Sequence, residues 1–391
     1  MRAAQYRHCA RQVQAQVLAL LQRQLRPRDF SRRCSAWQLL SSLVLATASC
    51  LSLTAVAALR RHSPSQTTLF QAWRATLPGY DRLLARTPRL LRASLPAGLR
   101  RRAARRRRYP LAIDLHGVPY YKRDRTPPVP VRKGRRLQGT AYAHQYATAC
   151  LLTKGQYYTV ALTPYTPGET LVALVRRLLR QAAGNGFPPR YVLMDRSFWS
   201  ADVFRYLQRA RYPFLLPVLG RGKRPDRPGG PTGTQQFLHG LCPSGRYAYT
   251  LRPGRQSVVT VTIVVQRRNH AGRRGRHGRH TQAYALWRVP VGSVRWVRES
   301  YRRRFRIESS YRLLEEARGR TNSRRPEVRL WYVVLALLLA NAWLQVRGEL
   351  ARQHRGDRRW EPCWSVRLLA ALAQVLWTEP DPSRAQPPPR S

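Results

Sequence analysis

Two short apolar runs, each ending in an aspartate, constrain the fold of this chain most strongly. The run Tyr109-Pro-Leu-Ala-Ile leads into Asp114, and the run Arg190-Tyr-Val-Leu-Met leads into Asp195. Short apolar runs bounded by turn residues are typical of buried β-strands. A helical pattern over residues 167–186 lies between them. Strands that alternate with helices in this way predict an α/β fold.

A third acid lies in a helical run farther along the chain. Residues three and four apart on a helix share a face, so Glu308 is expected to lie among arginines. That face consists of Tyr301, Arg304, Glu308, Tyr311 or Arg312, and Glu315. Together with Asp114 and Asp195, Glu308 completes a set of three carboxylates, the ligand type that hard cations such as Mg²⁺ require.

The order of these acids, with Glu308 inside the pattern Tyr-x2-Arg-x3-Glu, resembles the insertion-sequence DDE transposases with a ribonuclease-H-like core. The resemblance covers roughly residues 108–346 and is supported by the text Ile-Asp114-Leu-His-Gly-Val-Pro-Tyr-Tyr and Leu-Met-Asp195-Arg-Ser-Phe-Trp-Ser. In the family the pattern continues x6-Lys, whereas this chain has Glu315 in the lysine position. Either Arg312 or Arg318 makes the contact of that lysine, or the element is degenerate.

The resemblance implies an enzyme that cuts DNA at transposon ends and transfers the strand into target DNA. It implies two Mg²⁺ ions, for which Mn²⁺ may substitute, held by Asp114, Asp195 and Glu308. The residues implied to position the scissile phosphate are Tyr301, Arg304 and Arg312. The same resemblance implies that the partner is double-stranded DNA and that the protein is a homodimer in the synaptic complex. It also implies a prokaryotic, cytoplasmic and nucleoid-associated location. The competing hypothesis is a non-catalytic basic DNA-binding protein or a decayed transposase.

Composition independently favours a nucleic-acid partner. The 391 residues include 72 lysines and arginines against 18 acids, a formal net charge of +54, which attracts polyanions through counterion release. Residues 100–108 contain seven arginines in nine positions. We expect this stretch to contact DNA phosphates, through Arg105, Arg106, Arg107 and Arg108; a solvated linker is the alternative reading.

Six segments are predicted along the chain around a ribonuclease-H-like mixed sheet flanked by helices. They are a helical, DNA-end-binding domain (1–98), a basic linker (99–108), the first part of the catalytic core (109–213), a β-rich insertion before the glutamate helix (214–297), the second part of the core (298–350), and a C-terminal helix with a disordered tail (351–391). The core is predicted to contain strands over 109–114, 141–152, 157–162 and 190–195, with helices over 167–186 and 201–211. The insertion is predicted to contain strands over 246–251, 257–266 and 282–289.

The amino-terminal segment is predicted to hold three helices, over residues 5–25, from Ser31 or Ser35 to Leu59, and from Ser63 through Trp73. Helix, turn and helix is a geometry that reads DNA grooves, although an ordinary three-helix bundle has the same pattern. The position of this segment before the core favours DNA binding. Residues 74–108 are predicted to be a proline-punctuated connection.

Two uncharged runs, residues 35–59 and 330–346, approach the length of about 20 residues that a membrane-spanning helix needs. The first is rich in serine and threonine, and we interpret the second as a buried core helix packed on the catalytic sheet. We therefore expect no membrane association. The six cysteines form no C-x2-C pair, which argues against a zinc site or a disulfide framework and fits a reducing cytoplasm.

Several further residues have both a functional and a structural reading. His116 either positions groups near Asp114 or is a structural histidine, and the structural reading is the commoner one. Trp287 and Trp296 either stack on a base or pack in the fold, with packing favoured. A structural role as a cap, turn or salt-bridge residue is preferred for Asp124, Asp202, Glu299 and Glu316.

Overall fold

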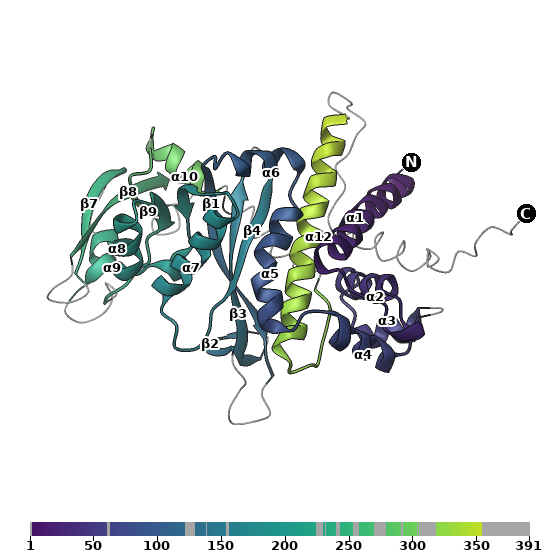
Figure 1. Cartoon of the computed structure of the whole chain (residues 1–391). Helices are drawn as coiled ribbons and strands as arrows, with labels where there is room; N and C mark the ends of the chain where they lie inside the picture. Colours follow the sequence, from purple (N-terminus) through teal and green to yellow (C-terminus); the bar gives the residue numbers. More distant parts are fainter. Residues whose placement is uncertain are drawn as a thin grey trace, which may run out of the picture.

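In the computed structural model, a nine-stranded mixed β-sheet runs through the molecule and helices flank it (Figure 1). The structure describes residues 2–60, 63–121, 130–137, 139–153, 156–223, 230, 232–239, 243–252, 258–269, 279–290, 292–302, 304 and 318–353. The strands are β1 (Tyr109–Pro119), β2 (Val131–Leu137), β3 (Thr140–Leu152), β4 (Tyr157–Pro164), β5 (Pro189–Leu193), β6 (Phe214–Pro217), β7 (Gly245–Leu251), β8 (Val259–Asn269) and β9 (Arg279–Trp287).

The α-helices are α1 (Arg2–Leu25), α2 (Ala36–Ala48), α3 (Leu53–Leu59), α4 (Gln66–Thr76), α5 (Tyr80–Ala93), α6 (Ala97–Ala104), α7 (Leu171–Gly184), α8 (Ala201–Arg209), α9 (Gly233–His239), α10 (Val294–Arg302) and α12 (Pro326–Gln353). Two short 3₁₀ turns, η1 (Ser31–Arg33) and η2 (Arg196–Phe198), complete the described elements. The predicted C-terminal helix and tail lie outside the described residues, apart from the last turn of α12.

The sheet is organised around β1. This strand pairs antiparallel with β3 and parallel with β5, β3 pairs antiparallel with β4, and β5 pairs parallel with β6. The spatial order is therefore β4-β3-β1-β5-β6, and β2 pairs with the part of β3 that β4 leaves open. A mixed sheet of this kind, flanked by helices, is compatible with a ribonuclease-H-like transposase fold.

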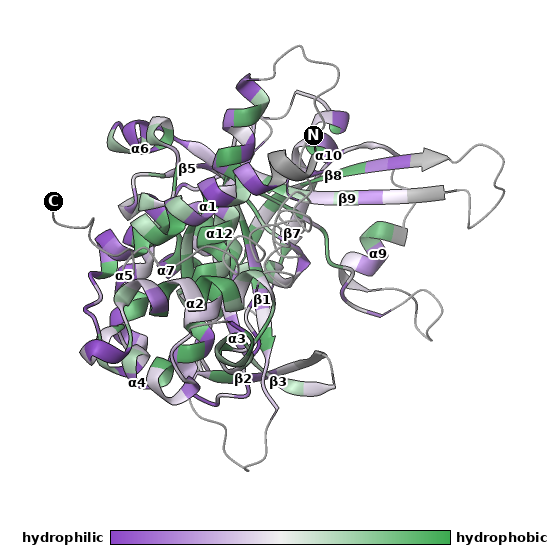
Figure 2. Cartoon of the chain, turned by 90° about the vertical axis from the view of Figure 1, so that its right-hand side faces the viewer, coloured by the Kyte–Doolittle hydropathy of each residue, from purple (hydrophilic) through white to green (hydrophobic). Residues whose placement is uncertain are grey.

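The three strands predicted for the insertion continue the same sheet. β9 pairs antiparallel with β6, β8 pairs with β9, and β7 pairs with β8. Figure 2 shows β8 and β9 projecting from the body as a two-stranded ribbon with hydrophilic residues toward its outer end. The sequence reading placed residues 214–217 in the insertion, but they form β6, which pairs with β5 inside the main sheet.

The two faces of the sheet carry different helices. Leu111 and Ile113 of β1 belong to a core cluster shared with α7 and α8. Ala112, on the opposite face, belongs to a cluster that includes Val297 and Tyr301 of α10. Because side chains alternate along a strand, the even-numbered residues of β1 all lie on the face of α10.

Helix α12, although late in the sequence, is the central helix of the helical part of the molecule that the N-terminal residues form. It shares one hydrophobic core with α1 to α5, and Figure 1 shows it between the sheet and α1. An 18-residue window of α12 is long and apolar enough to cross a membrane, yet 94% of that window is buried inside the protein. The interpretation of residues 330–346 as a buried core helix is thus confirmed. The pair α2 and α3 passes the same test of length and composition only as a unit bent by 110°.

The bend between α2 and α3 corrects the prediction of a single helix ending at Leu59. Ser35 caps α2 through a capping box with Gln38, and Ser35 is one of the two starts predicted for this helix. The helix ends at Ala48, Cys50 adopts a positive φ of 54°, and Ser52 caps α3. A residue in the left-handed region ends a helix, and a new serine cap starts the next one in another direction.

Residues 74–108 are another correction, because they form two helices and not a loose connection. Leu83, Leu90 and Leu91 are buried on one face of α5, which packs against α12 and β4. Pro88 lies inside this helix, and its carbonyl accepts a hydrogen bond of 3.0 Å from Asn185 Nδ2. Burial of the leucine face outweighs the one backbone hydrogen bond that a proline removes. The predicted basic linker is partly α6, and only Arg105 to Arg108 connect it to β1.

Candidate active site

Strand pairing brings Asp114 and Asp195 together. β1 and β5 are parallel neighbours, with Ala112 in register with Leu193. Asp114 and Asp195 each follow that pair by two residues, so they lie at the same level of the sheet. Parallel neighbours carry their residues in the same direction, which is why two acids 81 positions apart in sequence meet at one point.

The guanidinium of Arg304 lies between the two carboxylates. Its Nη2 is 3.0 Å from Asp114 Oδ2 and 4.0 Å from Asp195 Oδ2. The side chains of Arg304 and Asp114 are almost fully buried, with 5% and 11% exposure, whereas that of Asp195 is 32% exposed. A buried carboxylate needs a close counter-charge, and Arg304 supplies it.

Tyr301 at the end of α10 supports Arg304. Arg304 follows the helix in a turn in which its backbone N–H donates to the Tyr301 carbonyl at 2.8 Å. Arg304 Nη1 also donates to Tyr301 Oη at 3.3 Å. Burial raises the pKa of Tyr301 to about 12; the charge of Arg304 lowers it and that of Asp195 raises it. Tyr301 is therefore a neutral phenol at physiological pH.

Asp195 has two roles, one for each carboxylate oxygen. Its Oδ1 accepts hydrogen bonds from the backbone N–H of Ser197, at 2.8 Å, and from the Ser197 hydroxyl, so that Asp195 caps η2. Its Oδ2 faces Arg304. The capping bonds hold one oxygen of the carboxylate and leave the other 4.0 Å from Arg304 Nη2.

His116 lies on the same face of β1 as Asp114 and beside Arg318. Arg318 Nη1 and His116 Nε2 are 3.3 Å apart. Burial, and secondarily the charge of Arg318, lowers the pKa of His116 to about 3, so the ring is neutral. A neutral imidazole can accept a hydrogen bond from a guanidinium. The structural reading of His116 accounts for this contact.

The remaining predicted site residues fall into two groups. Glu308 and Arg312, together with Tyr311, Glu315, Asp124 and Glu316, lie outside the described residues. Arg105, Arg106, Arg107 and Arg108 are exposed just before β1, and their contact with DNA stays a prediction. Within the described part of the chain, no group of three or more histidine, cysteine or acidic residues is close enough to hold a metal ion.

Four structural readings are confirmed. Asp202 and Glu299 form exposed ion pairs within their own helices, with Arg205 at 3.1 Å and Arg295 at 2.8 Å. Trp287 stacks on Phe214 with ring centroids 6.4 Å apart, and Trp296 packs edge-on against Tyr191. These four residues therefore have structural partners.

A cation fits between the two aspartates. Both Oδ2 atoms point at one nitrogen of Arg304, so the fold already concentrates negative charge at a single position. Carboxylate oxygens are the donors that Mg²⁺ prefers, so Asp114 in β1 and Asp195 just beyond β5 are two of the ligands that a divalent site would need. A third ligand would have to come from elsewhere in the chain.

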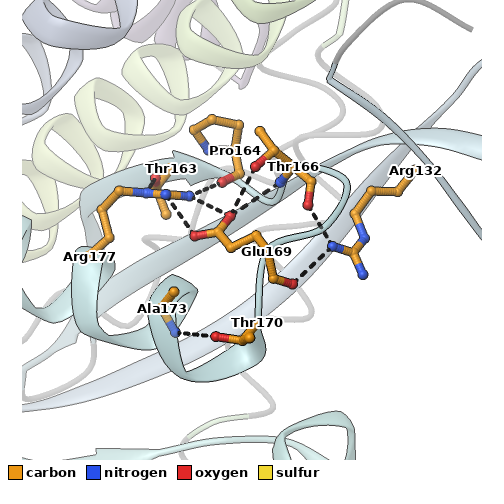
Figure 3. Close-up of polar contacts among 8 residues, drawn as sticks. All are labelled: Arg132, Thr163, Pro164, Thr166, Glu169, Thr170, Ala173 and Arg177. Atoms are coloured by element: carbon orange, nitrogen blue, oxygen red, sulfur yellow. Dashed lines mark hydrogen bonds and ion pairs between the residues drawn. The ribbon is translucent and has the colours of Figure 1, made fainter.

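Sequence reasoning missed a second polar cluster, at the connection between β4 and α7 (Figure 3). Arg177 Nη1 lies 2.7 Å from Glu169 Oε1, and Arg177 also donates to Thr163 Oγ1 and to the Pro164 carbonyl. Arg132 of β2 donates to the Thr166 carbonyl at 2.6 Å. The cluster ties β2, β4 and α7 together, and its groups satisfy one another. We regard it as a structural brace, signalled in the sequence only by the helix start at Thr170.

Comparison with known proteins supports the fold. No protein-family model matches the sequence, and no curated protein is significantly similar to it. Among solved structures, the chain is similar to a piggyBac transposase in a synaptic complex with hairpin DNA, with a TM-score of 0.53 and 11% identity. The match covers 88% of this chain and 72% of the piggyBac chain. The similarity is one of fold. At this sequence identity, the roles of individual piggyBac residues cannot be assigned to residues of this chain.

Proposed function

We propose that this chain is a DDE transposase that cleaves DNA at transposon ends and transfers the freed 3′ end into target DNA. The observation that carries the proposal is the meeting of Asp114 and Asp195 at the same level of two parallel strands. That pair occurs in a fold similar to that of a transposase. The net charge of +54 supports double-stranded DNA as the partner.

Asp114 and Asp195 would hold Mg²⁺ together with Glu308, the third acid of the family pattern. The metal supplies Lewis-acid stabilisation of the charge that develops on the phosphate, and it activates the attacking water or 3′ hydroxyl. Asp195 is preset for this role, because the cap on η2 fixes its carboxylate. Asp114 is preset by its position inside a central strand.

Arg304 would change partner when a metal and DNA bind. In the structure its guanidinium is the close counter-charge of the buried Asp114 carboxylate. If the two acids held a divalent cation, the guanidinium of Arg304 would be available to the scissile phosphate, for which its fork of donors is suited. The hydrogen bond from Arg304 Nη1 to Tyr301 Oη would keep the guanidinium near the site.

A Mg²⁺-dependent cleavage assay tests the proposal, using a duplex that carries the repeats flanking the coding region. We expect cleavage at the repeat end by the wild type, and binding without cleavage by Asp114→Asn, Asp195→Asn and Glu308→Gln. Asp202→Asn is the matched control, because Asp202 is an acid with an exposed ion pair on α8, and it should cut normally.

The alternative function is a non-catalytic DNA-binding protein derived from a transposase. The glutamate at position 315, where the family pattern has lysine, favours this alternative. Wild-type protein that binds the duplex but leaves it uncut with both Mg²⁺ and Mn²⁺ would establish it. The synaptic homodimer and the absence of membrane association stay part of the proposal, and sedimentation with paired end duplexes tests the dimer.

A further inference from the structure

A cavity on the side of β1 that carries Asp114 is lined by arginine and tyrosine. Its volume is about 670 Å³, within the range of roughly 300–1,000 Å³ typical of small-molecule sites. It lies between the end of β1 and the start of α12, and its lining includes Arg318, Arg320, Arg324 and Arg329. The lining residues include no aspartate or glutamate among the described part of the chain. Such a cavity attracts an anion.

Of the two tyrosines that line the cavity, only Tyr121 offers a surface suited to a flat ring. Tyr120 is 2% exposed and lies under the guanidinium of Arg329, whose carbon is 5.4 Å from the ring centroid. Tyr121 is 61% exposed, which makes it one of the three large hydrophobic side chains exposed to this degree in the described residues. An exposed tyrosine beside arginines is the combination that holds a nucleobase by stacking and its phosphate by charge.

The backbone that carries Arg318 and Arg320 is fixed against its neighbours. A Cβ atom on Gly319 would lie 2.2 Å from the ring of Tyr332, so only glycine allows this close approach of the segment to α12. The backbone N–H of Arg320 donates to the Leu51 carbonyl at 3.0 Å. Arg318 contacts His116, and Arg329 donates to the Pro119 carbonyl at 2.8 Å. The cavity is therefore a preformed site.

The cavity also continues the face of β1 that carries Asp114. Asp114, His116 and Val118 alternate onto one side of the strand, and Val118 lines the cavity. Four residues of strand span about 13 Å, so the cavity begins that far from the aspartate. One DNA strand advances about 3.4 Å per nucleotide along a duplex, so this distance corresponds to a few nucleotides.

We propose that this cavity binds a single nucleotide, with its phosphate on Arg318 and Arg320 and its base on Tyr121. The inference rests on the proposed function for its location next to a cleaved strand, but nucleotide binding itself needs no catalysis. The nucleotide is either part of a DNA strand or free in solution. Both sources present the same phosphate and base to the cavity.

Fluorescence anisotropy with a labelled eight-thymidine single strand, in the presence of EDTA, tests the proposal on the full chain. We expect Tyr121→Ala and Arg320→Gln each to weaken binding about five- to tenfold, and Tyr121→Phe to bind like the wild type. The matched control is Arg209→Gln, which removes one charge from an exposed arginine on α8 and should change affinity less than twofold. The loss in Tyr121→Ala should persist at 0.5 M NaCl, because stacking is not screened.

Competition distinguishes the two sources. If thymidine monophosphate displaces the labelled strand and inorganic phosphate does not, the cavity binds a free nucleotide. If neither competitor displaces the strand, while Tyr121→Ala and Arg320→Gln still weaken its binding, the cavity binds a nucleotide within a strand. If Tyr121→Ala and Arg320→Gln bind as well as Arg209→Gln, the cavity takes no nucleotide and the proposal is overturned. Because these measurements use no metal, their failure would leave cleavage by Asp114 and Asp195 to be judged on its own assay.

Discussion

At the scale of single residues, Arg304 sets the charge balance of the candidate site. One buried guanidinium faces two carboxylates, and its Nη2 is closer to Asp114 than to Asp195. The sequence placed Arg304 beside a DNA phosphate, whereas in the structure it neutralises an acid. Both roles use the same positive charge, and the proposed metal would decide between them.

Arg304→Met should destabilise the protein by about 3–5 kcal/mol, because it leaves Asp114 buried without its counter-charge. Urea unfolding in EDTA measures this loss. Millimolar Mg²⁺ should restore part of the stability, since a divalent cation can occupy the position of the guanidinium. The double variant Arg304→Met/Asp114→Asn should be more stable than the single variant, and Mg²⁺ should not change its free energy of unfolding. A single variant that gains nothing from Mg²⁺ would argue against a metal site at this pair.

His144 of β3 makes the stability depend on pH. It is fully buried, with its ring edge-on to Tyr120, and neither ring nitrogen has a hydrogen-bond partner among the described residues. Burial, and secondarily the charge of Arg329, lowers its pKa to about 3. The unfolded chain therefore binds a proton below pH of about 6.5 that the folded chain does not bind, so folding loses stability as pH falls from about 6.5 toward 3.

At pH 5.5 this histidine should cost about 1.4 kcal/mol relative to pH 7.5. His144→Phe removes the titrating group, so the difference in unfolding free energy between the two pH values should shrink by that amount. His8→Gln is the control, because His8 is exposed on α1. Equal pH dependence in wild type and His144→Phe would show that His144 does not titrate in this way.

At the scale of elements, α12 completes the open edge of β4. β4 pairs only with β3 among the described strands, and Asn341 of α12 covers its free side. Asn341 Oδ1 accepts from the Thr159 N–H at 3.0 Å, and its Nδ2 donates to the Thr159 carbonyl at 2.9 Å and to Ser94 Oγ at 2.8 Å. The side-chain amide thus makes the two bonds that another strand would make. This explains a polar residue in the middle of an apolar helix.

Asn341→Leu should destabilise the protein by about 2–4 kcal/mol, because it leaves two buried backbone groups of Thr159 without partners. Ser94→Ala is the matched control: it removes the third bond of Asn341 and the bond from Ser94 Oγ to the Leu91 carbonyl, leaves both Thr159 groups paired, and should cost about 1 kcal/mol. Thermal or urea unfolding of both variants provides the comparison. Similar losses in the two variants would mean that Asn341 does not bridge helix and strand.

At the scale of the whole molecule, the N-terminal helices and α12 share one core. Trp73 of α4 packs edge-on against Trp331 and Tyr332, with ring centroids 6.5 and 6.0 Å apart. Trp331 Nε1 also donates to the Pro78 carbonyl at 3.2 Å. The apolar faces of residues 1–98 are therefore covered by a helix that follows more than 220 positions later.

Residues 1–98 expressed alone should lack a cooperative unfolding transition, because removal of α12 exposes the apolar surface that these helices bury. Circular dichroism during a urea titration measures this, with residues 1–353 as the control that retains α12. A sharp transition in the 1–98 fragment would show that the helices form an independent domain. In that case a separable DNA-end-binding module would be supported.

Most of the local structure could be predicted from short stretches of sequence. Short apolar runs predict the central strands, and serines predict the start of α2 and, within two residues, that of α4, because both signals depend on neighbours within a few positions. Ser52, which caps α3, lies inside the single continuous helix predicted to end at Leu59. The aspartates were identified for the same reason: each ends or continues a recognisable apolar run. The family pattern then selected Asp114, Asp195 and Arg304 as site residues.

How those residues meet depends on contacts between distant parts of the chain. Strand register puts Asp114 level with Asp195, and the turn after α10 brings Arg304 between them. Neither contact has a local signal, because each joins segments far apart in sequence. The same holds for α5, whose leucines outweigh an internal proline only because α12 and β4 cover them, and for the arginine-lined cavity beside β1. Burial against distant partners is a free energy that no short stretch of sequence contains.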